Sequence, residues 1–359
     1  MKIFELLDLA QSKGASDLHL VVSSSPLLRI SGSLEPLTDT EEVAPDDVNE
    51  AFLQLTTPEQ REHFHRHLEL DFARTLRGGV RLRCNAAQQR GAISLAIRLL
   101  PPTIPTIDEL GLPEVCKDLI FRPRGLVVIS GPTGSGKSTT LASMIQHLNA
   151  NERRHVVTIE DPIEYIHASL ECAITQRELG SDTLSFAEAL RHVLRQDPDV
   201  ILVGEMRDVE TAAAVLTVAE TGHLVLTTGH APSAPQAMER VIDLFPPHER
   251  YLAQTRLASL LLGVLCQALV PRANDSGRIA SVEVMLANPP VRSLIREGKI
   301  YQLPNVIRTH AELGMITLDQ SLVDLHRRGM ITRENLFAFC NDREEVEKLT
   351  GEVKVKPPA

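Results

Sequence analysis

Short apolar runs alternate with helical segments in the middle of the chain. The runs, each of the length of a buried strand, lie at residues 126–130, 155–159, 200–204 and 223–228. Regular alternation of apolar strands with helices is typical of a parallel sheet that carries helices on both faces. The pattern therefore predicts an α/β fold for this part of the chain.

The first hundred residues follow a different pattern. They open with apolar residues at helical spacing, and strand-like segments follow at Asp17–Val22, Leu27–Ile30, Val80–Asn85 and Ile93–Leu99. We expect a small α/β module here. Three prolines come next within residues 101–105, and proline can continue neither a helix nor a central strand. They predict a semi-rigid linker and a domain boundary.

Beyond Pro289 and Pro290 the pattern becomes helical. Helices are predicted at Val291–Glu297, Thr317–Arg328 and Thr332–Phe339, and the Lys354–Pro358 tail is expected to fray. The predicted organisation is an N-terminal domain at 1–100, a linker at 101–113, a core at 114–288 and a helical C-terminal region at 289–359.

Composition narrows the class of protein. With 359 residues, of which 43% are hydrophobic and 23% charged, the chain can bury a sizeable core. No stretch approaches about 18 uninterrupted apolar residues, and the first residues lack the apolar core of a signal peptide, so we expect a cytoplasmic protein. Five scattered cysteines without a C-x-x-C pair indicate neither a disulfide framework nor a zinc site, but small buried side chains. The net charge of −10 disfavours broad nucleic-acid binding.

A glycine-rich loop directly follows the first of the apolar runs. Residues 131–138 read Gly-Pro-Thr-Gly-Ser-Gly-Lys-Ser, and this spacing lets successive backbone N–H groups point at phosphate oxygens. Lys137 is expected to reach the β- and γ-phosphates, and Ser138 to offer its hydroxyl to Mg²⁺. A helix predicted from Ser138 onward places its positive N-terminal end under the phosphates. The motif predicts a nucleoside triphosphate site.

Carboxylates and histidines follow the other predicted strands. Glu160 and Glu164 come after one run and Glu205 after another, at the strand ends that face the ligand crevice of an open α/β sheet. One carboxylate there can activate water and another can position Mg²⁺, although a solvated acidic turn is the alternative at Glu160. His223 and His230 bracket the next strand, as sensors of the γ-phosphate or as structural residues.

Several of these motifs together resemble one family. The run Leu194–Asp208 is similar to the signature of the secretion ATPase superfamily, the hexameric motors of type II secretion and type IV pili. In that superfamily Gly-Glu, here residues 204–205, replaces the usual aspartate. The acidic box 158–164 and the two-histidine box 223–230 match further motifs. Within the superfamily the chain resembles the PilT-type retraction ATPases of twitching motility, and the likeness covers nearly its whole length.

The resemblance implies a fold and a set of site residues. The fold is an N-terminal PAS-like α/β domain, a RecA-like P-loop ATPase core with a parallel sheet, and a helical C-terminal region. The residues implied to bind ATP and Mg²⁺ are Gly131, Pro132, Thr133, Gly134, Ser135, Gly136, Lys137, Ser138 and Thr139, with Arg81 and Arg240 as further phosphate candidates.

The resemblance also implies catalytic roles. Glu205 is the acid that holds Mg²⁺, partly through water; Glu164 is favoured as the activator of water, and Glu160 is the second candidate. His223 and His230 complete the implied set within the core. Arginines of a neighbouring subunit's N-terminal domain are implied to reach the γ-phosphate, and the matching residues here are Arg81, Arg83 and Arg98.

The function implied is that of a homo-hexameric, Mg²⁺-dependent ATPase that retracts type IV pili. Such a motor lies at the cytoplasmic face of the inner membrane, where it acts on a platform protein and through it on pilin, and no nucleic acid is expected as a partner. A pilus-assembly or type II secretion ATPase is one alternative, although the extra N-terminal domain and tetracysteine site usual there are not found. A non-hydrolysing regulatory paralogue and a nucleic-acid translocase are the others.

Two motifs depart from the family pattern. The second histidine lies in Gly229-His230-Ala231 where Leu-His-Thr is common, which puts the geometry of that histidine in question. Residues 290–295 read Pro-Val-Arg-Ser-Leu-Ile in place of Ala-Ile-Arg-Asn-Leu-Ile, which keeps the helical apolar spacing and Arg292.

Overall fold

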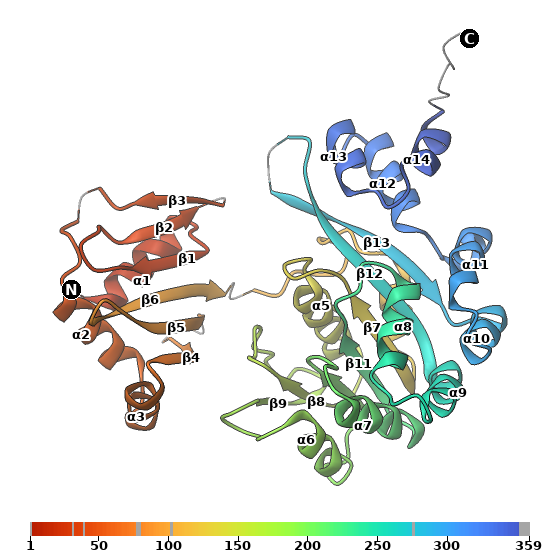
Figure 1. Cartoon of the computed structure of the whole chain (residues 1–359), viewed down its shortest axis with the longest axis horizontal. Coiled ribbons are helices and arrows are strands. Elements are labelled where there is room, and N and C mark those ends of the chain that lie inside the picture. Colours follow the sequence, from red (N-terminus) through yellow and green to blue (C-terminus); the bar gives the residue numbers. More distant parts are fainter. Residues whose placement is uncertain are drawn as a thin grey trace. The chain divides into compact units, whose positions relative to one another are not determined.

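The chain folds into two compact units (Figure 1). The computed structural model describes residues 2–30, 32–38, 40–76, 80–100, 103–274 and 277–351. The first unit comprises Met1–Thr103 with Pro162–Ile166, and the second comprises Ile104–Asp161 with His167–Ala359. Pro101 and Pro102 of the predicted linker, and the tail at 354–358, lie outside the described residues. The finer division into four parts stays a prediction.

In its described residues, the N-terminal unit is an antiparallel sheet with three helices. The sheet has six strands in the order β3-β2-β1-β6-β5-β4, and its core includes Leu18, Phe52, Leu82 and Ile97, each at most 1% exposed. The elements are α1 (Ile3–Ser12), β1 (Asp17–Leu20), β2 (Leu27–Ile30), β3 (Ser33–Pro36), α2 (Pro45–Leu55), α3 (Pro58–His67), β4 (Glu69–Thr75), β5 (Arg81–Gln89) and β6 (Ala92–Leu100).

The predicted α/β module is therefore present, but α2, α3, β3 and β4 were not predicted. Two of these lack an apolar pattern for a physical reason. All four residues of β3 are exposed, and α3 buries only Phe64. Elements with so little buried surface carry almost no periodicity that a sequence pattern could reveal.

The second unit contains a seven-stranded, mostly parallel sheet in the order β13-β12-β7-β11-β10-β8-β9. The predicted strands are present as β7, β8, β10 and β11, whereas β9, β12 and β13 were not predicted. Among the strands that the structure describes in this sheet, only β13 runs antiparallel to its neighbour. The strands are β7 (Gly125–Ser130), β8 (His155–Glu160), β9 (Ala173–Glu178), β10 (Val200–Val203), β11 (Leu224–Thr228), β12 (Leu261–Pro271) and β13 (Arg278–Leu286).

Helices cover both faces of this sheet (Figure 1). The side chains of β7 alternate between two cores: Leu126 and Val128 pack with α7 and α8, and Val127 and Ile129 pack with α5. A strand buried on both faces is expected to be apolar throughout. The helices of the core are α4 (Val115–Ile120), α5 (Lys137–Asn149), α6 (Phe186–Val193), α7 (Val209–Glu220), α8 (Ala234–Asp243) and α9 (Arg250–Leu260).

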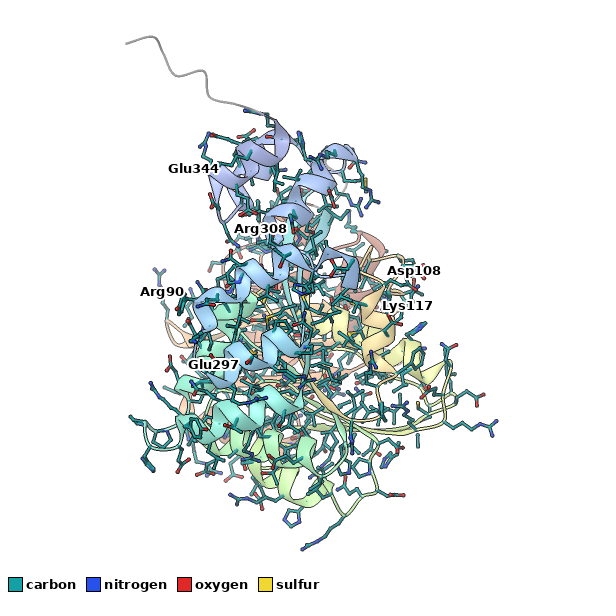
Figure 2. The ribbon with its side chains drawn as sticks, turned by 90° about the vertical axis from the view of Figure 1, so that its right-hand side faces the viewer. Arg90, Asp108, Lys117, Glu297, Arg308 and Glu344 are labelled. Atoms are coloured by element: carbon teal, nitrogen blue, oxygen red, sulfur yellow. The ribbon has the colours of Figure 1, made fainter. Side chains whose placement is uncertain are left out.

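The C-terminal helices pack on β12 and β13. A small core that includes Val270, Ile279 and Leu322 joins them to the sheet, and Arg308, labelled in Figure 2, pairs through two nitrogens with Glu345 on the last helix. The elements are α10 (Pro289–Arg296), η1 (Ile300–Gln302), α11 (Leu303–Thr309), η2 (Ala311–Leu313), α12 (Leu318–Arg327), α13 (Arg333–Phe339) and α14 (Arg343–Thr350). The three predicted C-terminal helices are thus α10, α12 and α13.

The cysteines are side chains of the two interiors, as the sequence predicted. Cys84, Cys116, Cys172 and Cys266 are buried, and Cys340 is partly buried. None of the helices in the described part of the chain has the length and apolar character that crossing a membrane requires.

A buried carboxylate connects two helices to β13. Glu283 is 5% exposed, and its oxygens accept hydrogen bonds from the backbone N–H of Ala234 at 2.6 Å and of Leu318 at 3.4 Å. These residues begin α8 and α12, and N–H groups at a helix start lack partners within the helix. Burial raises the pKa of the Glu283 carboxyl. The hydrogen bonds from the two N–H groups lower this pKa and the charge of Asp319 raises it, and the overall shift is upward.

We predict that Glu283→Gln lowers the free energy of unfolding by about 1–3 kcal/mol, because an amide leaves one helix N–H facing an NH₂ group. The folded-state pKa of Glu283 lies above its ordinary value of 4.5. Protonation of Glu283 therefore adds to the free energy of unfolding as the pH falls through the folded-state pKa, and this addition is lost as the pH rises through it. The difference between wild type and Glu283→Gln should accordingly widen from pH 8 to pH 5.

Urea unfolding followed by circular dichroism measures this difference. Glu344→Gln, an exposed change of the same kind on α14, is the matched control and should stay within about 0.5 kcal/mol of wild type. A difference that narrows as the pH falls would contradict the prediction.

Candidate active site

The loop between β7 and α5 is shaped by three glycines. Gly131, Gly134 and Gly136 have φ angles of 141°, 78° and 88°, a region that other residues adopt only with strain. A Cβ on Gly131 would lie 2.3 Å from the backbone oxygen of Gln267, and one on Gly136 would lie 2.8 Å from the Gln267 side-chain nitrogen. Glycine is therefore required at both positions by close approach to β12 as well as by backbone conformation.

The loop has the features of a phosphate cradle. Lys137 lies in the first turn of α5, and its Nζ donates to the carbonyls of Gly131 at 2.9 Å and Pro132 at 3.0 Å. The hydroxyl of Ser135 is buried with no hydrogen-bond partner among the described residues. A buried polar atom without a partner is costly, so this hydroxyl and the helix start fit an anionic ligand. Pro132, Thr133 and Gly134 are exposed, while Ser138 and Thr139 are half-buried.

Glu205 and His230 meet at the same edge of the sheet as the loop. Glu205 follows β10, and its side chain is 12% exposed. Its two carboxylate oxygens lie 3.2 Å from Nε2 of His230 and 2.7 Å from Nε of Arg207. His230 follows β11, the strand next to β7. The structure thus brings the predicted acid and the second histidine together.

The departure at residues 229–231 leaves His230 within reach of Glu205. Ser130, the last residue of β7, donates to the carbonyl of Ala231 at 2.7 Å and accepts from its N–H at 2.9 Å. A Cβ on Gly229 would lie 3.1 Å from this serine hydroxyl, so the small residue at 229 suits the close approach. Residues 229–231, called the histidine loop below, are therefore hydrogen-bonded to the strand that precedes the phosphate loop at 131–138.

Arg240 lies beside this histidine loop. Its guanidinium is 3.5 Å from the carbonyl of His230. Together with Arg207 and His230 it lines a cavity of about 130 Å³ between β11 and α8.

His223 is placed away from this edge. It precedes β11, and its carbonyl accepts from the N–H of Gly125 at the start of β7. Because β7 and β11 are parallel, His223 lies at the opposite end of the strand from the phosphate loop. Its ring contacts the Thr221 hydroxyl and the Val218 carbonyl at the end of α7. The structure therefore does not bring His223 to the phosphate loop, and its hydrogen bonds to Thr221 and Val218 are those of a structural histidine.

Glu160 and Glu164 belong to different units. Glu160 ends β8 in the core, where its Oε1 accepts from the Thr158 hydroxyl at 2.7 Å and from the Gln176 amide at 3.2 Å. These bonds fix the carboxylate at the carboxyl edge of the sheet. Glu164 lies in the segment that packs with the N-terminal unit. Which of the two activates water stays a prediction.

The three predicted arginines share one face of the N-terminal sheet. Arg81 and Arg83 alternate with the buried Leu82 along β5, and Arg98 lies opposite Arg83 on β6. Arg83 is exposed. Arg98 pairs at 2.8 Å with Asp17, and Arg81 donates to the carbonyl of Ile163 at 2.7 Å. Burial raises the pKa of the Asp17 carboxyl, but hydrogen bonds from Ser16 and Arg98 outweigh that effect and lower it overall.

Sequence reasoning missed Ser130, Gln176 and Gln267. Ser130 and Gln176 carry no signal of their own, because Ser130 bonds to Ala231 in the loop after β11 and Gln176 bonds to Glu160 at the end of β8, both in other segments of the chain. Gln267 does carry one: it is an amide in the middle of the otherwise apolar run 261–270, and a buried amide needs partners.

A glycine-rich loop before a helix, with a largely buried carboxylate at the same sheet edge, is typical of a P-loop nucleotide-hydrolysing enzyme. The family model described as "Type II/IV secretion system protein" matches residues 59–321. The chain belongs to this family, and it is an ATP-binding ATPase of the type IV pilus and secretion group.

Relatives are similar over nearly the whole chain. The type IV pilus retraction ATPase PilT of Pseudomonas aeruginosa is 44% identical over 93% of this chain and 97% of its own. The type IV pilus ATPase PilU of the same organism is 41% identical over 96% of this chain and 90% of its own. A crystal structure of the pilus retraction motor PilT with bound ADP has a TM-score of 0.90 and 39% identity, covering 97% of this chain and 99% of its own. The predicted family and fold are confirmed.

We predict that Glu205→Gln lowers kcat for ATP hydrolysis by about 10²-fold or more, because it removes a largely buried charge from the sheet edge that carries the phosphate loop. ADP binding should change by less than about threefold, since loop and helix supply that affinity. Steady-state hydrolysis and fluorescent-ADP titration measure the two effects. Glu210→Gln, an exposed change in α7, is the control. Equal rates for the two variants would exclude Glu205 from catalysis.

Proposed function

We propose that this protein is a homo-hexameric motor that couples ATP hydrolysis to retraction of type IV pili. The observation that carries the proposal is the likeness to a retraction ATPase over 93% of the chain, joined to a core in which the phosphate loop, Glu205 and His230 meet at one sheet edge. The motor works at the cytoplasmic face of the inner membrane. It acts there on a platform protein, and through it on pilin.

ATP binding begins at the loop. Backbone N–H groups of residues 133–138 donate hydrogen bonds to the phosphate oxygens. The Lys137 ammonium leaves the carbonyls of Gly131 and Pro132 and binds the β- and γ-phosphates instead. Lys137 is 9% exposed, so the new ion pairs form in a poorly solvated environment, where they are stronger than in water.

Mg²⁺ fits the oxygen donors at this edge. The Ser138 hydroxyl and the Glu205 carboxylate are hard ligands of the kind that this ion takes. The described residues contain no cluster of three or more metal-binding side chains, which suits an ion that keeps several waters and binds phosphate. Mg²⁺ would neutralise charge on the phosphates during transfer. Ser138 and Glu205 would hold it, the latter partly through water.

The attacking water is activated by a carboxylate, for which Glu164 and Glu160 are the candidates. His230 senses whether the γ-phosphate has been released. It contacts Glu205, and the neighbouring Ala231 is hydrogen-bonded to Ser130 at the end of the strand that precedes the phosphate loop. Loss of the γ-phosphate changes the charge facing Glu205. That change reaches α8, which begins three residues after Ala231.

Arginines of a neighbouring subunit complete the site. Arg81, Arg83 and Arg98 lie on one face of the N-terminal sheet, and guanidinium groups suit the charge that develops in phosphoryl transfer. ATP then binds between the N-terminal unit of one subunit and the core of the next. Binding closes that interface, and hydrolysis releases it.

An accessory pilus ATPase is the second candidate. The observation in its favour is the 41% identity to PilU over 96% of the chain, a likeness almost as strong as that to PilT.

We predict that two inactive variants restore activity when their subunits are mixed. Lys137→Ala disables the loop and Arg83→Ala disables the arginine, so each homo-hexamer should hydrolyse ATP at less than about a tenth of the wild-type rate. Mixed rings contain interfaces with an intact loop and an intact arginine, about a quarter of the total on random exchange. Hydrolysis after exchange of subunits measures the recovery. Rates that stay at the level of the separate variants would contradict the shared site.

Deletion of the gene separates the candidate functions. For a retraction motor we expect pili to remain or accumulate on the surface while twitching and pilus-generated force are lost. Missing pili would identify an assembly ATPase. Unchanged retraction with a second retraction ATPase present would identify an accessory one. Twitching assays and electron microscopy of surface pili measure these outcomes, with the Glu205→Gln allele as the test of whether hydrolysis is needed.

A further inference from the structure

One buried amide contacts the phosphate loop from the neighbouring strand. Gln267 lies on β12 and is 4% exposed. Its Nε2 donates to the carbonyl of Ser135 at 2.6 Å, and its Oε1 accepts from the hydroxyl of Thr140 at 2.8 Å. Ser135 lies within the loop, whereas Thr140 lies in the first turn of α5 and is 1% exposed. The amide thus joins the loop and the helix that follows it.

The position of Gln267 in the sheet places it where the loop begins. Cys266 of β12 pairs with Ser130, the last residue of β7, so Gln267 lies one residue beyond the point at which β7 ends. Its backbone oxygen faces Gly131 and its side chain faces Gly136. Gln267 therefore contacts the glycine-rich segment near both of its ends.

The contact with Ser135 determines the orientation of a peptide group. In a trans peptide the C=O of one residue and the N–H of the next point in opposite directions. Holding the Ser135 carbonyl toward β12 therefore turns the Gly136 N–H away from β12. A loop with three glycines at positive φ has little conformational preference of its own, so a constraint from outside the loop is needed to keep this orientation.

Both ends of the amide are required for this arrangement. A carbonyl can only accept, so the atom that faces Ser135 must be the NH₂ group, and the oxygen is then left for the Thr140 hydroxyl. Glutamate would set a carboxylate against the Ser135 carbonyl, and methionine would fill the same space without hydrogen bonds.

We propose that Gln267 is a positioning residue for nucleotide binding: its carboxamide holds the peptide between Ser135 and Gly136 so that the Gly136 N–H faces the phosphates. Gln267 acts through the loop and not on the nucleotide. The proposal rests on the nucleotide site of the ATPase and is independent of whether the motor retracts or assembles pili.

The expected effect is on affinity more than on turnover. Without the amide the loop samples other conformations, and the apparent Kd rises in inverse proportion to the fraction that remains competent to bind. Nucleotide that does bind reorders the loop, so the chemical step proceeds nearly as before. A merely structural role would do the reverse: it would lower the amount of folded enzyme and leave the Kd and KM of the folded fraction unchanged.

The experiment compares the full-length hexamer of wild type and Gln267→Met, with fluorescent ADP as the probe. We expect the Kd for ADP and the KM for ATP to rise at least about tenfold in Gln267→Met, while kcat falls less than about threefold. Leu265→Ala, in the same strand and buried in the apolar core that includes side chains of α5, removes packing without removing a hydrogen bond to the loop and is the matched control. It should lose stability in urea yet keep the wild-type Kd and KM.

A second pair of variants tests the other end of the amide. Thr140→Val removes the hydroxyl and should raise the Kd for ADP severalfold, whereas Thr140→Ser keeps the hydroxyl and should bind like wild type. If Gln267→Met does not fold, this pair of threonine variants tests whether the Gln267 carboxamide supports nucleotide binding. Binding within about twofold of wild type in Gln267→Met, or equal loss in both threonine variants, would overturn the proposal. Failure of wild type itself to bind ADP would instead contradict the nucleotide site.

Discussion

The site depends on one constraint, the parallel direction of the central strands. β7, β11, β10 and β8 are neighbours in that order, so their carboxyl ends lie along one edge and deliver residues from four separate segments to the same place. Neighbouring strands are about 4.8 Å apart, which is close enough for side chains from adjacent strand ends to touch. His230 and Glu205 meet at 3.2 Å for this reason. Any residue before a strand, such as His223, is carried by the same geometry to the far edge.

Hydrogen bonds from buried polar side chains fix the loops and helix starts to the strands of this sheet. Ser130 joins the histidine loop to β7, Gln267 joins the phosphate loop to β12, and Glu283 joins the starts of α8 and α12 to β13. Each bridges segments that are distant in the sequence. Apolar packing is non-directional, whereas these groups must find partners of the right geometry or carry a desolvation penalty. They therefore specify how the loops attach to an otherwise apolar sheet.

Prediction from the sequence succeeded best at the phosphate loop and the elements beside it, where the signal is local. Strand β7, the loop and α5 follow one another within about 25 residues, and the spacing of glycines and lysine has a direct chemical meaning. Contacts across the sheet could not be predicted, because the partners of Ser130 and Gln267 lie more than 100 residues away. Strands β12 and β13 form one antiparallel pair with no motif attached, and their apolar runs do not distinguish strand from buried helix. The choice between Glu160 and Glu164 depends on geometry that no pattern contains.

The burial of the cysteines bears on how this enzyme responds to oxidants. Only a thiolate reacts readily, and burial raises the pKa of Cys84 and Cys116 to about 12 and that of Cys266 well above its ordinary value. These three thiols stay protonated at neutral pH and are buried, so in the folded chain they should react slowly with peroxide and with alkylating reagents. A cysteine introduced on an exposed helix would consequently be labelled by a thiol-reactive dye ahead of the native ones, and could report subunit movement during turnover.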